Sequence, residues 1–81
     1  MRTLLATEPV RLVRWVFQRG ENALTCEVER SRSTYDVCVV PHWDVSAAVV
    51  EAVPSSTDAF QRHAEIVQYL RETGWSLTSR S

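Results

Sequence analysis

The chain contains no lysine: all nine of its lysine-plus-arginine residues are arginines, among 81 residues in total. This absence excludes Schiff-base chemistry, the lysine of a phosphate-binding loop and nucleophiles activated by lysine. Two glycines are too few for a glycine-rich phosphate loop. The formal net charge of −1 excludes a polycation that coats nucleic acid along its whole length.

Cysteines and long apolar runs are also scarce. Cys26 and Cys38 are too few for a disulfide-stapled scaffold, and their spacing matches no zinc motif. We expect both to be buried thiols, with no metal or cofactor. Residues 1–9 lack the apolar core of a signal peptide, and no stretch approaches the roughly 18 apolar residues of a membrane span. The sequence therefore predicts a cytoplasmic protein.

The remaining composition is that of a folded domain, with 44% hydrophobic and 23% charged residues. We predict a flexible N-terminal arm over residues 1–9, a single domain over 10–75 and a frayed tail over 76–81. A domain this small buries only about 60% of its unfolded surface, so further burial against a partner is plausible. There is no nucleophile elbow and no His-x-x-x-His or Glu-x-x-His motif, so we expect no enzymatic activity.

A β-hairpin is predicted from residues 10–17 and 23–29, which are rich in β-formers and, in the second run, alternate cleanly. Gly20-Glu21 suits a two-residue type II′ turn, which requires positive φ at its first position. Counting outward from this turn sets Arg14 opposite Glu27 on one face. The other face then carries the apolar pairs Phe17 with Leu24, Trp15 with Cys26, and Val13 with Val28.

A third strand is expected over residues 34–40, but its register stays open. A two-residue turn pairs Val28 with Val37 and sets Glu29 against Asp36, two like charges. A three-residue turn pairs Arg30 with Asp36 instead.

Residues 45–53 suit either a strand or a helix. Four valines favour a strand, whereas three alanines allow a helix capped by Asp44. Because the run is short and ends at Pro54, we predict a fourth strand over residues 47–53.

An amphipathic helix follows, capped by Ser55 or Ser56, with Asp58 placed to meet the helix dipole and to pair with Arg62. We expect His63 at the core edge, with one hydrogen bond. The apolar stripe consists of Ala59, Phe60, Ala64, Ile66, Val67 and Leu70.

Gly74 suits the left-handed end of this helix and folds Trp75 back onto Leu70. The predicted fold is therefore α+β: a four-stranded antiparallel meander with one C-terminal helix packed on one face (ββββα, two-layer).

One helix covers only one side of a sheet, and the first strand is apolar on both. Val10, Leu12 and Val16 are the candidate interface residues on the second side, where a second copy or another protein would cover them. We therefore expect a small non-enzymatic interaction module, either a homodimer or a subunit bound to a protein partner, and no membrane contact.

Two other binding sites are candidates. Arg14, Arg19, Arg30 and Arg32, near aromatic residues, could hold single-stranded nucleic acid, although residues 11–32 carry only five arginines against three glutamates. In the second candidate, His42, Trp43 and Asp44 form a loop cluster that could bind a small ligand, or the tryptophan could cap the sheet edge.

The run Leu24-Thr25-Cys26-Glu27-Val28, together with Gly74-Trp75 after the last helix, resembles a set of short bacterial proteins of unknown function. The resemblance covers roughly residues 14–76. It implies a strand meander followed by a helix, and no catalytic or binding residue.

Overall fold

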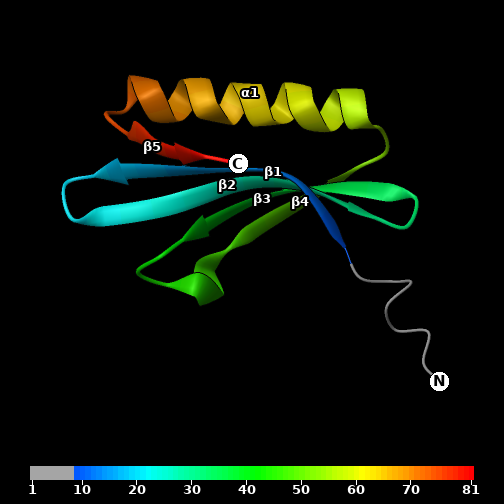
Figure 1. The fold of residues 1–81 in the computed structure, drawn as a ribbon, viewed down its shortest axis with the longest axis horizontal. Coiled ribbons are helices and arrows are strands. Elements are labelled where there is room, and N and C mark those ends of the chain that lie inside the picture. Colours follow the sequence, from blue (N-terminus) through cyan, green and yellow to red (C-terminus); the bar gives the residue numbers. More distant parts are fainter. Residues whose placement is uncertain (1–8) are drawn as a thin grey trace.

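The structure, a computed structural model, describes residues 9–81, which form one antiparallel sheet of five strands and one α-helix (Figure 1). The strand order is β4-β3-β2-β1-β5. Almost all of the predicted N-terminal arm, residues 1–8, lies outside the described residues. The elements are β1 (Val10–Arg19), β2 (Asn22–Ser31), β3 (Thr34–Pro41), the 3-10 helix η2 (Val45–Ala47), β4 (Val49–Val53), α1 (Ser56–Glu72) and β5 (Ser76–Arg80).

The β1–β2 hairpin has the predicted register. Gly20 has a φ of 61°, as the first position of a type II′ turn requires. Arg14 stands opposite Glu27 as expected. The predicted apolar pairs are also confirmed: Phe17 with Leu24, Trp15 with Cys26, and Val13 with Val28.

The register between β2 and β3 is the one that a two-residue turn allows. Val28 pairs with Val37, and Glu29 stands opposite Asp36. Val28 is 0% exposed and Val37 is 2% exposed, so this register buries both valines beneath α1. Burial of two branched side chains outweighs the repulsion of two partly solvated carboxylates.

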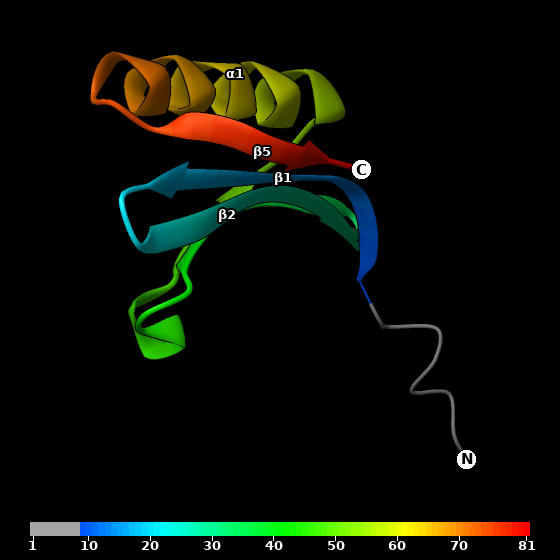
Figure 2. The ribbon, with the colours of Figure 1, turned by 60° about the vertical axis from the view of Figure 1, so that its left-hand side comes forward.

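The fourth strand is confirmed, although β4 begins at Val49 and η2 precedes it. The turn that contains η2 extends from the sheet on the side away from α1 (Figures 1 and 2).

Both ends of α1 have the predicted caps. The Ser55 hydroxyl accepts a hydrogen bond from the Asp58 N–H at 3.1 Å. At the other end, Gly74 has a φ of 94°, and the Trp75 N–H donates to the Leu70 carbonyl at 2.9 Å, as in a Schellman motif. Trp75 and Leu70 belong to one buried cluster.

Two expectations about the helix surface are wrong. Arg62 does not pair with Asp58, because the sheet offers it Glu51 on β4, and Glu65 lies one turn further along α1. Phe60 is exposed, because the buried side of α1 is formed by Ala59, His63, Val67 and Leu70.

The prediction of four strands and a frayed tail is also wrong. The α+β class, the antiparallel sheet and the helix are confirmed, but α1 lies between β4 and β5 in the chain. Residues 76–80 form β5, which returns beside β1 (Figure 2). Backbone hydrogen bonds in both directions, of 2.8 and 2.9 Å, join Ser81 to Arg14, and Leu77 packs on the core. Pairing with β1 overrides the weak strand propensity of this polar segment.

The sheet has two unlike sides. The helix face is the side that α1 covers, and it carries Val28 and Val37. The open face is the opposite side, which carries Thr25 and Cys38 by the alternation of the strands.

Candidate interaction surface

The open face carries a charged network across β1, β2 and β3. Nε of Arg14 lies 3.4 Å from Oε1 of Glu27, which confirms the predicted pair, and Nε of Arg11 lies 4.0 Å from the same oxygen. Burial raises the pKa of Glu29, repulsion from Glu27 and Asp36 raises it further, and Arg11 opposes the shift. This part of the open face is therefore polar, and both of its arginines lie beside Glu27.

A small buried centre lies beside this network. Thr25 and Cys38 are 3% and 6% exposed, although they lie on the side of the sheet opposite α1. Oγ1 of Thr25 shares a hydrogen bond of 2.6 Å with Nε2 of His42, and the half-buried Val16 and Val40 flank Thr25 in the adjacent strands. The open face thus buries part of its own apolar surface.

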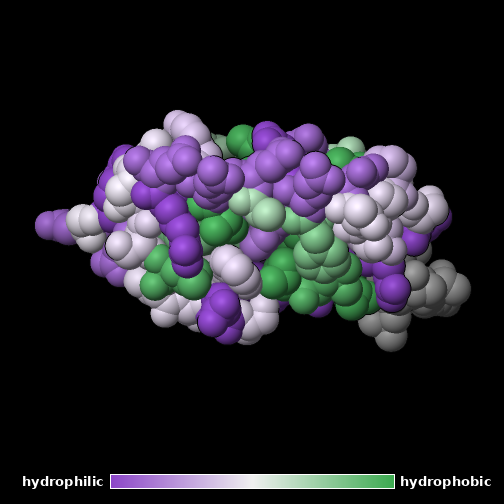
Figure 3. Space-filling model, turned by 90° about the horizontal axis from the view of Figure 1, so that it is seen from above, coloured by the Kyte–Doolittle hydropathy of each residue, from purple (hydrophilic) through white to green (hydrophobic). Residues whose placement is uncertain are grey.

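The three candidate interface residues do not share one face. A register shift lies between Arg11 and Val13, so Val10 pairs with Arg30 and lies on the helix face, whereas Val16 pairs with Thr25 on the open face. A bulge adds one residue to the strand and reverses the alternation beyond it. Val10 and Leu12 are nevertheless exposed, at 48% and 38%. Seen from the side of α1, the molecule also shows hydrophobic surface beside the hydrophilic outer side of the helix (Figure 3).

His42, Trp43 and Asp44 diverge instead of forming one site. His42 turns to Thr25 on the open face. Trp43 stacks on Trp75 at the end of α1, with ring centroids 6.2 Å apart. Oδ1 of Asp44 accepts from the Ser46 hydroxyl at 2.6 Å. The expectation that Trp43 tucks back as a cap describes this geometry better than a convergent ligand cluster.

The four candidate arginines do not gather on one surface either. Arg14 lies on the open face, whereas Arg30 stands opposite Tyr35, which packs on the helix-face core. The Arg19 guanidinium donates to the Thr73 carbonyl at 2.8 Å, and its Cζ lies 4.7 Å from the centroid of the Trp75 ring. Arg19 therefore stabilises the end of α1. The remaining one, Arg32, lies in the β2–β3 turn, at the other end of β2 from the turn beside Arg19.

Both cysteines are buried free thiols. Burial, more than neighbouring negative groups, raises the pKa of Cys26 to about 12 and that of Cys38 to about 11. Such thiols are poor nucleophiles and poor metal ligands at neutral pH. Within residues 9–81, no group of three or more His, Cys, Asp and Glu side chains is arranged to hold a metal ion.

Among residues 9–81, the largest concentration of exposed apolar side chains lies elsewhere, in the segment that follows β3 and includes β4. We call this segment, residues 43–53, the β4 arm. Its large apolar side chains are more than half exposed: Trp43, whose ring also stacks on Trp75, is 58% exposed, Val45 66%, Val49 64% and Val50 60%. The sequence pattern identifies these valines only as strand formers. The signal that could have identified this surface is the run of valines and alanines over residues 45–53, in which Glu51 is the one charged residue.

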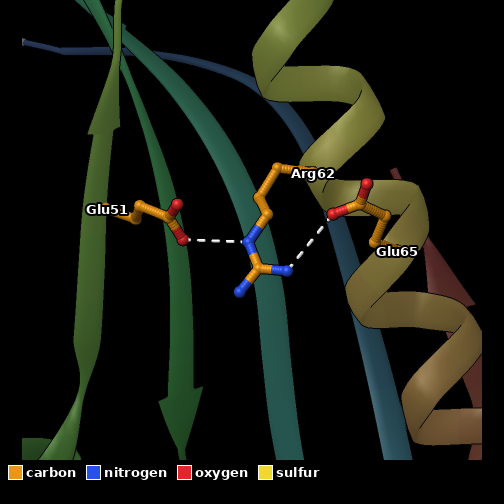
Figure 4. A network of polar contacts seen from close by, with 3 residues as sticks. All are labelled: Glu51, Arg62 and Glu65. Atoms are coloured by element: carbon orange, nitrogen blue, oxygen red, sulfur yellow. Dashed lines mark hydrogen bonds and ion pairs between the residues drawn. The ribbon is translucent and has the colours of Figure 1, made fainter.

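Both carboxylates of the β4 arm have a hydrogen-bond partner within the chain. Oε1 of Glu51 accepts from Nε of Arg62 on α1 at 2.9 Å, and Nη1 of Arg62 lies 3.3 Å from Oε1 of Glu65 (Figure 4). The Asp44 carboxylate is bonded to Ser46. The exposed edge of the sheet therefore presents four large apolar side chains together with one ion-paired carboxylate, Glu51, and one carboxylate bonded to a hydroxyl, Asp44.

Comparisons with protein-family models, with curated protein sequences and with solved structures found no match. In the described part of the chain, no helix is both long and apolar enough to cross a membrane. The arrangement of the surface itself therefore carries the functional argument.

Proposed function

We propose that this protein is a small non-enzymatic interaction module that self-associates, and that the β4 arm forms the contact surface. The observation that carries the proposal is the group of exposed apolar side chains at one edge of the sheet: Trp43, Val45, Val49 and Val50. Exposed apolar groups at a strand edge are unfavourable in a monomer and gain free energy when a partner removes them from water.

The open face, which the sequence favoured as the interface, supports the proposal less well. It satisfies Arg14, Glu27 and Thr25 within the chain, and it contributes Val50 at its margin. The polar network would lie beside an association surface rather than at its centre. This matches the usual anatomy of interfaces, in which an apolar core has a polar rim.

Sedimentation velocity across micromolar concentrations tests the proposal. We expect the wild-type protein to form a dimer reversibly, and a Val49→Thr, Val50→Thr double variant to dissociate at concentrations at least about tenfold higher, because threonine keeps the strand propensity and loses apolar surface. Val10→Thr is the matched control, since Val10 is also exposed but lies on β1.

Two outcomes would contradict this assignment. A wild-type protein that stays monomeric would refute self-association. An association that Val10→Thr weakens and the double variant does not would place the interface on β1. A salt-sensitive mobility shift with single-stranded oligonucleotides, lost in Arg30→Glu, would instead support the nucleic-acid alternative.

A further inference from the structure

The backbone of β4 has one side bonded to β3 and one side open. His42, which directly follows β3, donates its N–H to the Ala23 carbonyl of β2 at 2.9 Å. Backbone groups alternate along a strand, so the even-numbered residues of β3 direct their N–H and C=O groups towards β2, as His42 does. The odd-numbered residues of β3 direct theirs towards β4. Their partners Val49, Glu51 and Val53 therefore turn their N–H and C=O groups inward.

The intervening residues, Val50 and Ala52, direct their N–H and C=O groups away from β3. Within residues 9–81, no strand pairs with this outer side of β4. The opposite sheet edge is protected differently: a register shift breaks the β1–β5 ladder, the Thr78 hydroxyl bonds to the Val16 carbonyl, and Arg80 covers the Trp15 ring. β4 has neither a bulge nor an internal proline, lysine or arginine.

We propose that a second copy of this chain adds to β4 as an antiparallel strand, about a two-fold axis that places Val50 opposite Val50 of the second copy. This inference deepens the proposed self-association and rests on it. The pairing would join two five-stranded sheets into one continuous sheet, with both α1 helices on the same side.

The choice of a second copy rests on the self-complementarity of this edge. An antiparallel pair about a two-fold axis brings the same outward groups together from both chains, so each Val50 N–H meets the carbonyl of the other Val50. The contact closes on itself and leaves no further β4 edge to extend. A β4–β5 contact would instead repeat from copy to copy as an open assembly.

Charge and backbone chemistry disfavour the two registers centred on the residues that follow Val50. A pair centred on Glu51 would set two carboxylates directly opposite each other, which is unfavourable. A pair centred on Ala52 would bring Val50 opposite Pro54, which has no N–H to donate. The Val50-centred pair avoids both.

In the Val50-centred pair, the Ala52 N–H faces the carbonyl of Ala48 in the second copy. The N–H of Ala48 already donates to the Val45 carbonyl at 3.1 Å, so this residue needs no acceptor across the interface. Glu51 stands opposite Val49 of the second copy and keeps its partner Arg62. No like charges oppose each other in this register.

Disulfide trapping tests the register. Facing residues of a hydrogen-bonded antiparallel pair have Cα atoms about 5.5 Å apart, which suits a disulfide. We expect Val50→Cys to form covalent dimers rapidly under mild oxidation. In Ala52→Cys the two thiols would lie roughly 13 Å apart along the strands, so this matched variant is expected to remain uncrosslinked. The wild-type protein controls for Cys26 and Cys38, which are buried.

A proline variant provides a second readout that needs no oxidation. Ala52→Pro removes an N–H that points away from β3, so the fold is expected to persist by circular dichroism. Loss of this donor in both copies should raise the dimer dissociation constant roughly 30-fold.

The outcomes of these experiments test the Val50-centred pairing separately from self-association itself. Crosslinking of Val50→Cys alone, together with weakened association of Ala52→Pro, supports the proposed pairing. Crosslinks that form only when Val50→Cys and Ala52→Cys are mixed indicate the Glu51-centred register and overturn it. Reversible dimers by sedimentation that neither cysteine variant traps and Ala52→Pro does not weaken also overturn strand addition, while self-association survives. A monomer refutes the proposed function itself.

Discussion

The buried histidine of α1 should make the stability of this protein depend on pH. His63 is 5% exposed, and its ring meets Trp15 edge-on, with centroids 5.1 Å apart and planes at 86°. Its Nε2 has no hydrogen-bond partner within residues 9–81. Burial lowers the pKa of His63, and a hydrogen bond with the backbone of Cys26 opposes part of the shift.

The sign of the effect follows from the lowered pKa. Below about pH 6.5 the unfolded chain binds a proton on His63 more readily than the folded chain does, so the free energy of unfolding falls as the pH falls. The fall ends once the pH passes below the pKa of the folded state. Because a single proton is involved, the slope from this group cannot exceed about 1.4 kcal/mol per pH unit.

His63→Leu removes this titration and offers a measurable contrast. The substitution relieves an unpartnered buried nitrogen, which costs about 1–3 kcal/mol. It also loses the hydrogen bond with the Cys26 backbone and the aromatic contact with Trp15, each worth about 0.5–1.5 kcal/mol. These contributions nearly cancel, so we expect the variant to match the wild-type stability near pH 7.5 to within about 2 kcal/mol. Its stability relative to the wild type should grow as the pH falls below about 6.5.

Urea denaturation followed by tryptophan fluorescence, repeated between about pH 5 and 8, measures the difference. His42→Asn is the control. Because it leaves His63 in place, its free energy of unfolding should still fall increasingly below that of His63→Leu as the pH is lowered. A difference between wild type and His63→Leu that stays constant with pH would refute the argument, because it would show that His63 titrates alike in the folded and unfolded states.

Three further predictions test the core, a turn and the thiols. Val37→Ala should lower the free energy of unfolding by about 2 kcal/mol, as measured by urea denaturation, because Val37 is buried. Val45→Ala, at an exposed position, should change the free energy of unfolding by less than about 0.5 kcal/mol. Equal losses in the two variants would contradict the register of β3. Gly20→Ala should destabilise the hairpin by about 1 kcal/mol because φ is 61°, and Gly20→Asn should recover part of the loss in a thermal melt. Burial raises the pKa of Cys26 to about 12 and that of Cys38 to about 11. At pH 8, Cys26 should therefore react with iodoacetamide about 1,000-fold, and Cys38 about 100-fold, more slowly than a thiol of pKa 9.0, as measured by mass spectrometry. Rates equal to those of the denatured chain would refute this prediction.

Features that depend on neighbours in the chain were predictable. The turn at Gly20 requires positive φ, and its two-residue length sets every pair of the β1–β2 hairpin as far as Val13. The Ser55 cap and the Gly74 end of α1 likewise involve hydrogen bonds over a few residues. The local pattern therefore predicted the hairpin, the helix and both helix ends.

Features that depend on competition between groups far apart in the sequence were not predictable. Two registers of β3 remained open until the burial of Val28 and Val37 beneath α1 selected one. The bulge beside Leu12, which places Val10 and Val16 on opposite faces, was not predicted, because the adjacent apolar residues Leu12 and Val13 also fit the two faces of a regular strand. The candidate surface changed accordingly, from one face of β1 to the β4 arm.

The amino-acid order alone was enough to establish an α+β domain with an antiparallel meander, because periodicity, turn residues and caps act over short separations. The place of residues 76–80 depended on contacts across the fold: a polar segment became β5 because β1 offered unpaired backbone groups beside it. The same physics leaves β4 as an edge in the described chain. Side-chain order shows which residues prefer a strand, but which strand has an unpaired side is a property of the assembled sheet.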